Sequence, residues 1–226
     1  MATMLTQVPL FVCPAQLRGL SYNLLVSLLP LFPLDMVLLP GAPLPLHIFE
    51  PRYKEMIGEA LAGNKPFGLV RAKENSLAEL GCTAEIMEVT KKYEDGRMDI
   101  VAEGRQRFEI MQVNEERSFL QAEVRYFDDD PGNPPPSDVE KLLTMHQELL
   151  ALAGAESAEA PEVDEPQISF HIAGMLPLDL DFKQTLLGMR SEPQRVTALI
   201  EYYTALLPRV RRTLKVRDKA RGNGHV

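Results

Sequence analysis

The sequence has no tryptophan, only two cysteines and no long uninterrupted apolar run. Cys13 and Cys82 are too few for a disulfide scaffold, so we interpret them as free thiols in a reducing cytoplasm. A membrane-spanning helix needs about 18 consecutive apolar residues, and prolines interrupt every candidate stretch. The formal net charge of −8 argues against nucleic acid as the main partner. We therefore expect a cytoplasmic protein that binds neither membrane nor nucleic acid.

Motifs that would carry catalysis are also missing. There is no G-x-x-x-x-G-K-[ST] loop to cradle phosphates and no G-x-S-x-G nucleophile elbow. His146 and Glu148 have the H-x-E spacing of zinc deaminases, but no P-C-x-x-C follows them. A zinc site needs about three or four ligands at workable spacing, and both cysteines stand alone. The sequence predicts no catalytic residue, no metal site and no cofactor.

The composition is that of an ordinary globular protein, with 45% hydrophobic and 25% charged residues in a chain of 226. The first 34 residues differ, because Arg18 is their only charged side chain. They lack the charged start of a signal peptide, and prolines break their apolar runs. We interpret residues 1–27 as a poorly ordered accessory extension or as the product of a misassigned start codon, and the sequence does not distinguish the two.

The spacing of apolar residues changes once along the chain. Before residue 128 it is mostly the period of two that is typical of strands, interrupted by one helix that starts at Pro51. After a stretch rich in Asp, Pro and Gly, the period becomes helical. We therefore expect a β subdomain over 28–127, a linker over 128–137, a helical subdomain over 138–216 and a tail over 217–226.

The helical subdomain contains recognisable helix ends. We expect Ser137, Asp181 and Ser191 to cap three of its helices. The segment 209–221 holds seven basic residues and one acid, which we interpret as a cationic helix end that runs into a solvated tail.

Four prolines lie within residues 40–57, beside and inside an alternating apolar series. Because proline has no backbone donor, this series predicts an edge strand rather than a central one. Such a strand is either a stiff edge that closes a barrel or a rim that contacts peptide directly. On the second interpretation, the polypeptide-binding residues are Leu44, Leu46, Ile48 and Phe49.

The stretch LFPLDMVLLPGAPLPLHIFEPRY, residues 31–53, resembles the opening signature of the Lon protease N-terminal domain, also called the Lon substrate-binding domain. A second block agrees with it, and the resemblance covers about residues 30–210. It implies an α+β fold: a PUA-like β pseudo-barrel with one inserted helix, followed by a helical bundle. The residues that we expect to be structurally important are Pro40, Gly41, Glu50, Arg52, Tyr53, Gly104 and Arg107.

Two of these residues carry specific expectations. Glu50 is expected to form an ion pair with Arg107 that pins the inserted helix to the barrel. Gly104 is expected to supply a positive φ at a turn.

The resemblance also implies a function. This chain looks like a free-standing form of the domain, without the ATPase and peptidase modules of full-length Lon. We expect a recognition module for unfolded or exposed-hydrophobic polypeptides in protein quality control, with a protease or chaperone as a further partner. Two alternatives remain open: a non-autonomous component of an ATP-dependent peptidase, and a binder of small molecules in a pocket between barrel and bundle.

Overall fold

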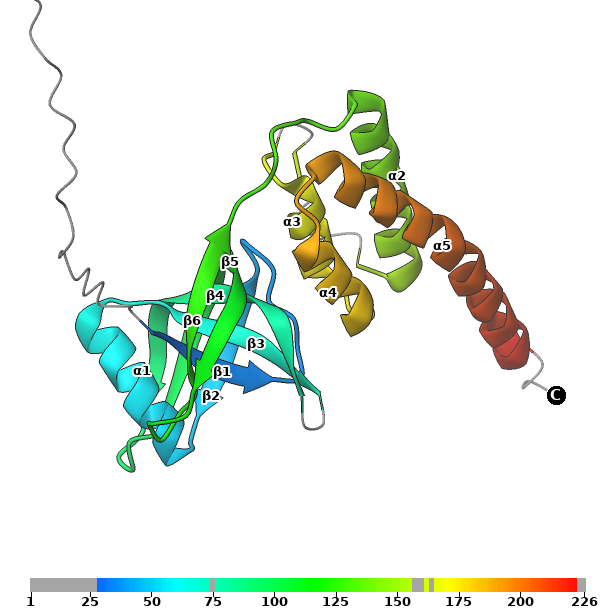
Figure 1. The fold of residues 1–226 in the computed structure, drawn as a ribbon. Coiled ribbons are helices and arrows are strands. Elements are labelled where there is room, and N and C mark those ends of the chain that lie inside the picture. Colours follow the sequence, from blue (N-terminus) through cyan, green and yellow to red (C-terminus); the bar gives the residue numbers. More distant parts are fainter. Residues whose placement is uncertain (1–27, 74–75, 156–160, 163–164, 223–226) are drawn as a thin grey trace, which may run out of the picture.

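The computed structural model describes residues 28–73, 76–155, 161–162 and 165–222 (Figure 1). The expectation for residues 1–27 lies outside these ranges. The expected α+β class, a β pseudo-barrel with one inserted helix followed by a helical bundle, is confirmed. The first half contains β1 (Leu29–Leu34), β2 (Pro43–Ile48), α1 (Pro51–Gly63), β3 (Phe67–Lys73), β4 (Ser76–Lys92), β5 (Met98–Asn114) and β6 (Gln121–Phe127). The second half contains α2 (Pro136–Ala153), α3 (Ile168–Met175), α4 (Leu180–Gly188) and α5 (Glu192–Gly222).

Five strands close into a ring in the order β5-β4-β3-β1-β6, because β6 pairs back onto β5. β1 runs parallel to β3, and the other neighbours in the ring are antiparallel. β4 and β5 have 17 residues each, and register shifts along their pairing let them curve around the barrel. Closure removes most of the open edges that a flat sheet would expose.

β2 lies outside this ring and pairs with β5 alone among the described strands. Pro43 stands opposite Glu103, and Pro45 stands opposite Val101. Both prolines are exposed. Leu44 lies between them, Ile48 follows them, and both of these side chains are buried in the core. The prediction that this proline-rich series forms an edge strand is confirmed, and the reason is the missing backbone donor of proline.

Helix α1 follows β2 directly, with Pro51 in its first turn, as expected. Its buried face consists of Tyr53, Met56, Ile57 and Ala60, and this face packs on the barrel. Asn64 ends the helix in the left-handed region, with φ 47°. A helix that covers one side of the barrel is therefore encoded locally, in its proline, its apolar stripe and its left-handed cap.

The helical part begins earlier and continues further than the sequence predicted. α2 starts at Pro136 without a side-chain cap, so the expected role of Ser137 is wrong. Asp179 caps α4 by accepting from the backbone N–H groups of residues 181 and 182, at 3.0 Å each, so the cap is not Asp181. Ser191 Oγ accepts from the backbone of Gln194 at 3.4 Å, as expected. The helix α5 extends to Gly222, into the expected tail.

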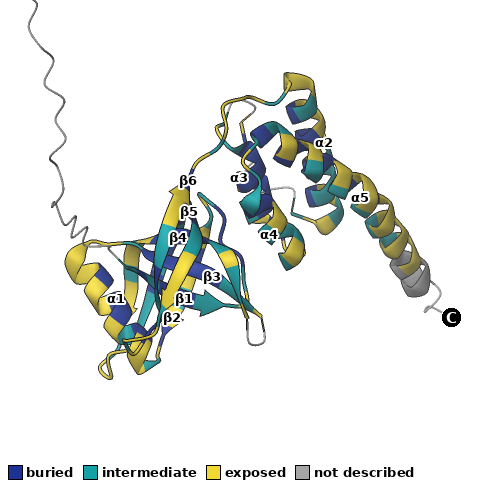
Figure 2. Ribbon diagram, in the orientation of Figure 1, coloured by how far each residue is buried: buried dark blue, intermediate teal, exposed yellow. Residues whose placement is uncertain are grey.

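The two halves share one apolar core. Figure 2 shows buried residues inside the barrel and on the facing sides of the helices. One cluster runs from Leu39 and Met56 in the first half to Ile172 and Leu199 in the second. His146 lies in the helical part of this core, stacked on the ring of Tyr203, and burial lowers its pKa. Its H-x-E spacing with Glu148 thus reflects core packing.

No helix in the described part of the chain is long and apolar enough to cross a membrane.

Candidate functional site

The junction between barrel and bundle is held by a buried charge network centred on Asp129. This residue belongs to the stretch that the sequence marked as a linker. Arg107 Nη2, from β5, donates to its carboxylate. Arg195, from α5, donates to both carboxylate oxygens, with Nη1 at 2.7 Å and Nη2 at 2.5 Å. Because the two arginines come from different halves, Asp129 links them.

The same arginines also hold backbone groups of the bundle. Arg107 Nη1 donates to the carbonyl oxygens of Leu187 at 3.1 Å and Met189 at 2.6 Å. Arg195 is fully buried and also contacts Glu192 and Ser169. Burial alone would raise the pKa of Asp129, but hydrogen bonds and charges from the two arginines and Gln167 outweigh it and lower the pKa. The network is therefore charged and internally satisfied, as a structural junction requires.

The expected pair between Glu50 and Arg107 is wrong. Glu50 pairs instead with Arg52, two residues along the chain, at 2.8 Å, and both side chains are largely exposed. Arg107 instead forms an ion pair with Asp129, at the junction with the helical part. Arg52 also lies over the ring of Tyr53, 4.5 Å from its centre. The sequence identified both charged residues but could not show which partner each would meet.

Gly104 is required for a different reason from the one expected. It lies inside β5 and is not among the residues with positive φ, which include Gly41 at 75°. A Cβ at Gly104 would lie 2.2 Å from the carbonyl oxygen of Leu39. Gly41 N–H donates to the carbonyl oxygen of Gly104 at 2.9 Å, and Gly104 N–H donates to the carbonyl oxygen of Ala42 at 3.0 Å. Close backbone approach, rather than a turn, explains this glycine.

The four candidate polypeptide-binding residues do not form one surface. Leu44 and Ile48 are each 1% exposed and belong to the core, so neither can contact a ligand in this conformation. Leu46 is partly buried against the same core. Phe49 is 58% exposed and stacks on His47, with 5.9 Å between ring centres. Only Phe49, with part of Leu46, is available at this rim.

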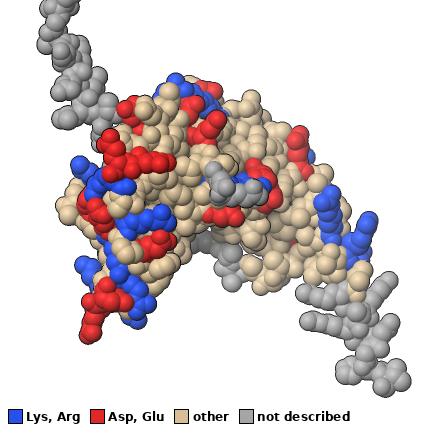
Figure 3. Space-filling model, turned by 60° about the horizontal axis from the view of Figure 1, so that its bottom comes forward, with Lys and Arg blue, Asp and Glu red and all other residues tan. Residues whose placement is uncertain are grey.

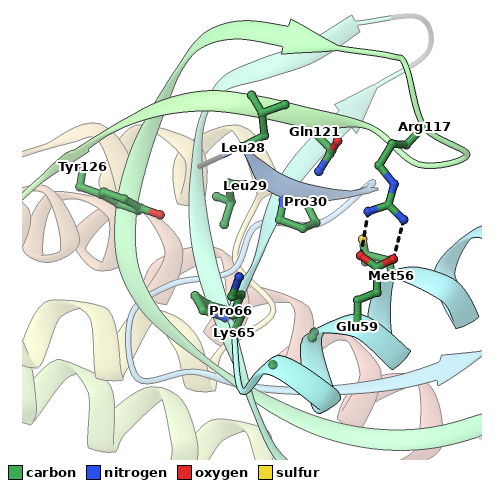
Figure 4. Close-up of a pocket in the computed structure, with 12 residues that line it drawn as sticks. Leu28, Leu29, Pro30, Met56, Glu59, Lys65, Pro66, Arg117, Gln121 and Tyr126 are labelled. Carbon is green, nitrogen blue, oxygen red and sulfur yellow. Dashed lines mark hydrogen bonds and ion pairs between the residues drawn. The ribbon is translucent and has the colours of Figure 1, made fainter. Parts of the chain in front are cut away.

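A larger apolar cavity opens elsewhere on the barrel, between α1 and strands β1 and β6. Its volume is about 590 Å³, within the range of small-molecule and peptide sites. Figure 4 shows side chains from these three elements converging on it. We call this cavity the α1 groove, and its apolar walls are Leu28, Leu29, Pro30, Met56, Ala60, Pro66 and Tyr126.

Charged groups close one end of the α1 groove. Arg117 donates to Glu59 on α1 at 2.7 and 2.5 Å (Figure 4), and it also donates to Glu55 at 2.6 Å. The hydrogen bond from Arg117 lowers the pKa of Glu59, so this end stays ionised and paired. Tyr126 stands at the other end and is 45% exposed. Between these ends the lining is mainly apolar, with Lys65 and Gln121 as its polar side chains.

Strands β1 and β6 meet beside the α1 groove. Among the described residues, Leu29 pairs with Ala122 and Pro30 pairs with Gln121. Leu31 N–H also donates to the carbonyl oxygen of Leu120 at 2.8 Å. The walls of the groove on this side are therefore held together by backbone hydrogen bonds.

The residues that line the α1 groove were missed by the sequence reasoning. Leu28 was recognised only as the start of the β subdomain. The sequence placed an alternative pocket between barrel and bundle, where a cavity of about 290 Å³ does lie beside Arg107 and Gln167. No local signal indicates that α1, β1 and β6 meet around a cavity.

The basic end of α5 is a separate feature. Figure 3 shows a group of Lys and Arg side chains near the C-terminal end of this helix. Arg211 pairs with Glu148 of α2 at 2.7 Å, while Arg209, Arg212 and Lys215 are exposed. Because α5 continues to Gly222, these residues lie about two turns or more before its end, outside the last turn in which the helix dipole stabilises cations.

Comparison with known proteins places this fold in a protease context. The model of the ATP-dependent protease La (LON) substrate-binding domain matches residues 28–204. The Lon protease of Flavobacterium johnsoniae is 24% identical over 212 residues, which cover 85% of this chain and 26% of that protein. Lon protease 1 of Hydrogenovibrio crunogenus is 25% identical over 182 residues, which cover 74% of this chain and 22% of that protein. The chain thus spans about a quarter of the length of these relatives.

Solved structures show the same fold. The crystal structure of a Lon N-terminal domain protein from Xanthomonas campestris gives a TM-score of 0.64 at 23% identity, covering 78% of this chain and 98% of that one. The N-terminal domain of the Mycobacterium avium complex Lon protease gives a TM-score of 0.60 at 19% identity, and the match covers 79% of this chain and 98% of that one. The expected resemblance is confirmed, and the chain belongs to the family of the ATP-dependent protease La (LON) substrate-binding domain.

Proposed function

We propose that this protein is a polypeptide-recognition module without catalysis of its own, and that the α1 groove is its binding site. Membership in a substrate-binding family supports the general function. The observation that carries the site is the mainly apolar cavity between α1, β1 and β6. An extended peptide would bury its apolar side chains in this cavity.

The chemistry of the groove favours unfolded, apolar clients. Its walls are mainly leucine, proline, methionine and tyrosine side chains, with Lys65 and Gln121 as polar members, and its charged end is already paired. Burial of apolar side chains is not directional, so such a site would accept many peptides. We expect a dissociation constant of about 1 µM, or about −8 kcal/mol, which suits a module that binds and releases many clients. The role that we propose is in cytoplasmic protein quality control, together with a separate protease or chaperone.

Exposed apolar side chains allow the site to be tested with matched substitutions. Tyr126→Ser removes a ring that lines the groove, whereas Met87→Ser changes a side chain on β4 that is 54% exposed and does not line it. Tyrosine is enriched among the interface residues whose truncation costs more than about 1 kcal/mol. We expect Tyr126→Ser to weaken binding of a denatured-protein peptide about tenfold and Met87→Ser to leave it unchanged, as measured by fluorescence anisotropy.

Phe49→Ser tests the remaining part of the rim at β2. If Phe49→Ser weakens binding and Tyr126→Ser does not, the binding site is the rim and the groove assignment is wrong. Equal affinities for all three variants would reject both sites. Hydrolysis of ATP or casein by the homogeneous protein would overturn the proposal that it lacks catalysis.

A further inference from the structure

One side of α5 carries a group of basic residues beside a surface hollow of about 460 Å³. We call it the basic face, and its residues are Pro208, Arg211, Arg212, Lys215 and Val216. They recur at intervals of three and four residues, so they share one side of the helix. Figure 3 shows Lys and Arg side chains gathered near this end of α5. The helix dipole does not account for them, because the helix continues to Gly222.

Packing within the chain does not account for the basic face either. Leu207 is buried, but no side chain from 208 to 216 is, and Val216 is 63% exposed. Arg212 and Lys215 are also exposed and stand three residues apart, where like charges destabilise a helix. A single short helix is marginal in water without tertiary contacts. A bound partner of opposite charge would therefore stabilise this part of α5.

The charge of this segment is opposite to that of the remaining chain. Residues 209–221 hold seven of the 24 basic residues and one of the 32 acidic residues. The segment therefore carries a formal charge of +6, and the remaining chain carries −14. Two basic faces would repel each other, and the acidic remainder would repel a long polyanion such as a nucleic acid. A short acidic segment of another protein avoids both kinds of repulsion.

We propose that the basic face of α5 binds an acidic amphipathic helix of another protein. Arg209, Arg212 and Lys215 are exposed and follow one another at intervals of three residues, or about 4.5 Å along the axis. Carboxylates spaced by three or four residues on a partner helix match this row. Pro208 and Val216 would contact the apolar side chains of that helix in the hollow. The proposal does not rest on the function of the α1 groove, which other residues line.

Binding of a designed peptide tests the proposal. The probe is a fluorescein-labelled helical peptide of about 20 residues, built from Glu, Ala and Leu with a leucine at every third or fourth position. The control peptide has Gln in place of every Glu. By fluorescence anisotropy with the full chain, the acidic probe should bind at least tenfold more tightly than the control. Raising the salt from about 50 to about 300 mM should weaken its binding at least threefold. Equal affinity for both peptides, or no binding of either, would overturn the proposal.

Charge-reversal variants locate the binding surface. One double variant combines Arg212→Glu with Lys215→Glu on the basic face. The control combines Lys92→Glu with Lys141→Glu, which makes the same change in net charge at exposed positions elsewhere. The first should weaken binding of the acidic probe at least tenfold and the second less than threefold. All four residues are exposed, so both variants should fold, and circular dichroism checks this. Equal losses in the two variants would mean that net charge alone acts, and would reject the basic face.

Two measurements separate the acidic helix from other occupants of the basic face. Sedimentation equilibrium should give the same mass for the native protein and for the double variant Arg212→Glu, Lys215→Glu. A dimer that this variant dissociates would show that the occupant is a second copy of the chain, which overturns the proposal. A single-stranded DNA with the same charge as the acidic probe should bind at least tenfold more weakly than that probe. Tighter binding of the DNA would identify a nucleic-acid site instead.

Discussion

Asp129→Ala is expected to lower the free energy of unfolding by about 3 kcal/mol, because it leaves two buried arginines without their shared carboxylate. Both arginines would keep their carbonyl contacts and lose the charge of Asp129, while Arg195 would still pair with Glu192. The effect is measured by urea denaturation at pH 7. Asp128→Ala is the matched control, since Asp128 is the exposed neighbour, and it should change stability by less than about 0.5 kcal/mol.

The same network predicts a pH dependence. The pKa of Asp129 is lower in the folded protein than its ordinary value of 3.8, so the unfolded chain binds the proton more readily. Its contribution is fully present above about pH 4 and is lost as the pH falls through the folded pKa. The stability difference between the native protein and Asp129→Ala should therefore shrink below pH 4. A difference that stays constant down to pH 2 would contradict the assigned role.

Gly104→Ala is expected to destabilise the barrel by about 3 kcal/mol, at the upper end of overpacking effects, because the obstructing atom is backbone. The added Cβ would lie 2.2 Å from the carbonyl oxygen of Leu39, so the segment before β2 must move. Gly58→Ala is a matched control on α1, where a Cβ meets nothing within 4 Å. There alanine should stabilise by about 0.5–1 kcal/mol through its helix propensity. Thermal unfolding of both variants measures the contrast, and similar melting temperatures would refute the close-approach explanation.

Local features of the chain were predictable from the sequence because their causes are local. Pro43 and Pro45 cannot donate hydrogen bonds, which determines that β2 is an edge. Pro51 and Asn64 mark the ends of α1 by their backbone preferences. The change of apolar period near residue 128 separates the strand part from the helical part.

Partners across the fold were not predictable, because they depend on tertiary arrangement. Glu50 and Arg107 look like a reasonable pair along the chain, but the barrel directs Arg107 toward Asp129. The alternation of residues along β2 places Leu44 and Ile48 on the same face of the strand. It does not show whether that face packs on the core or faces solvent. The α1 groove depends on how α1, β1 and β6 meet in the closed barrel, and only the tertiary structure reveals that.

The central claim is that clients bind in the α1 groove, and an NMR titration tests it most directly. The isotope-labelled protein is titrated with an unlabelled, permanently unfolded polypeptide, and backbone amide shifts are followed residue by residue. We predict that the largest shifts occur at Leu29, Ala60, Gln121 and Tyr126, which line the groove. Saturating binding with shifts confined to β2 or to α5, and none at these four residues, would contradict the claim.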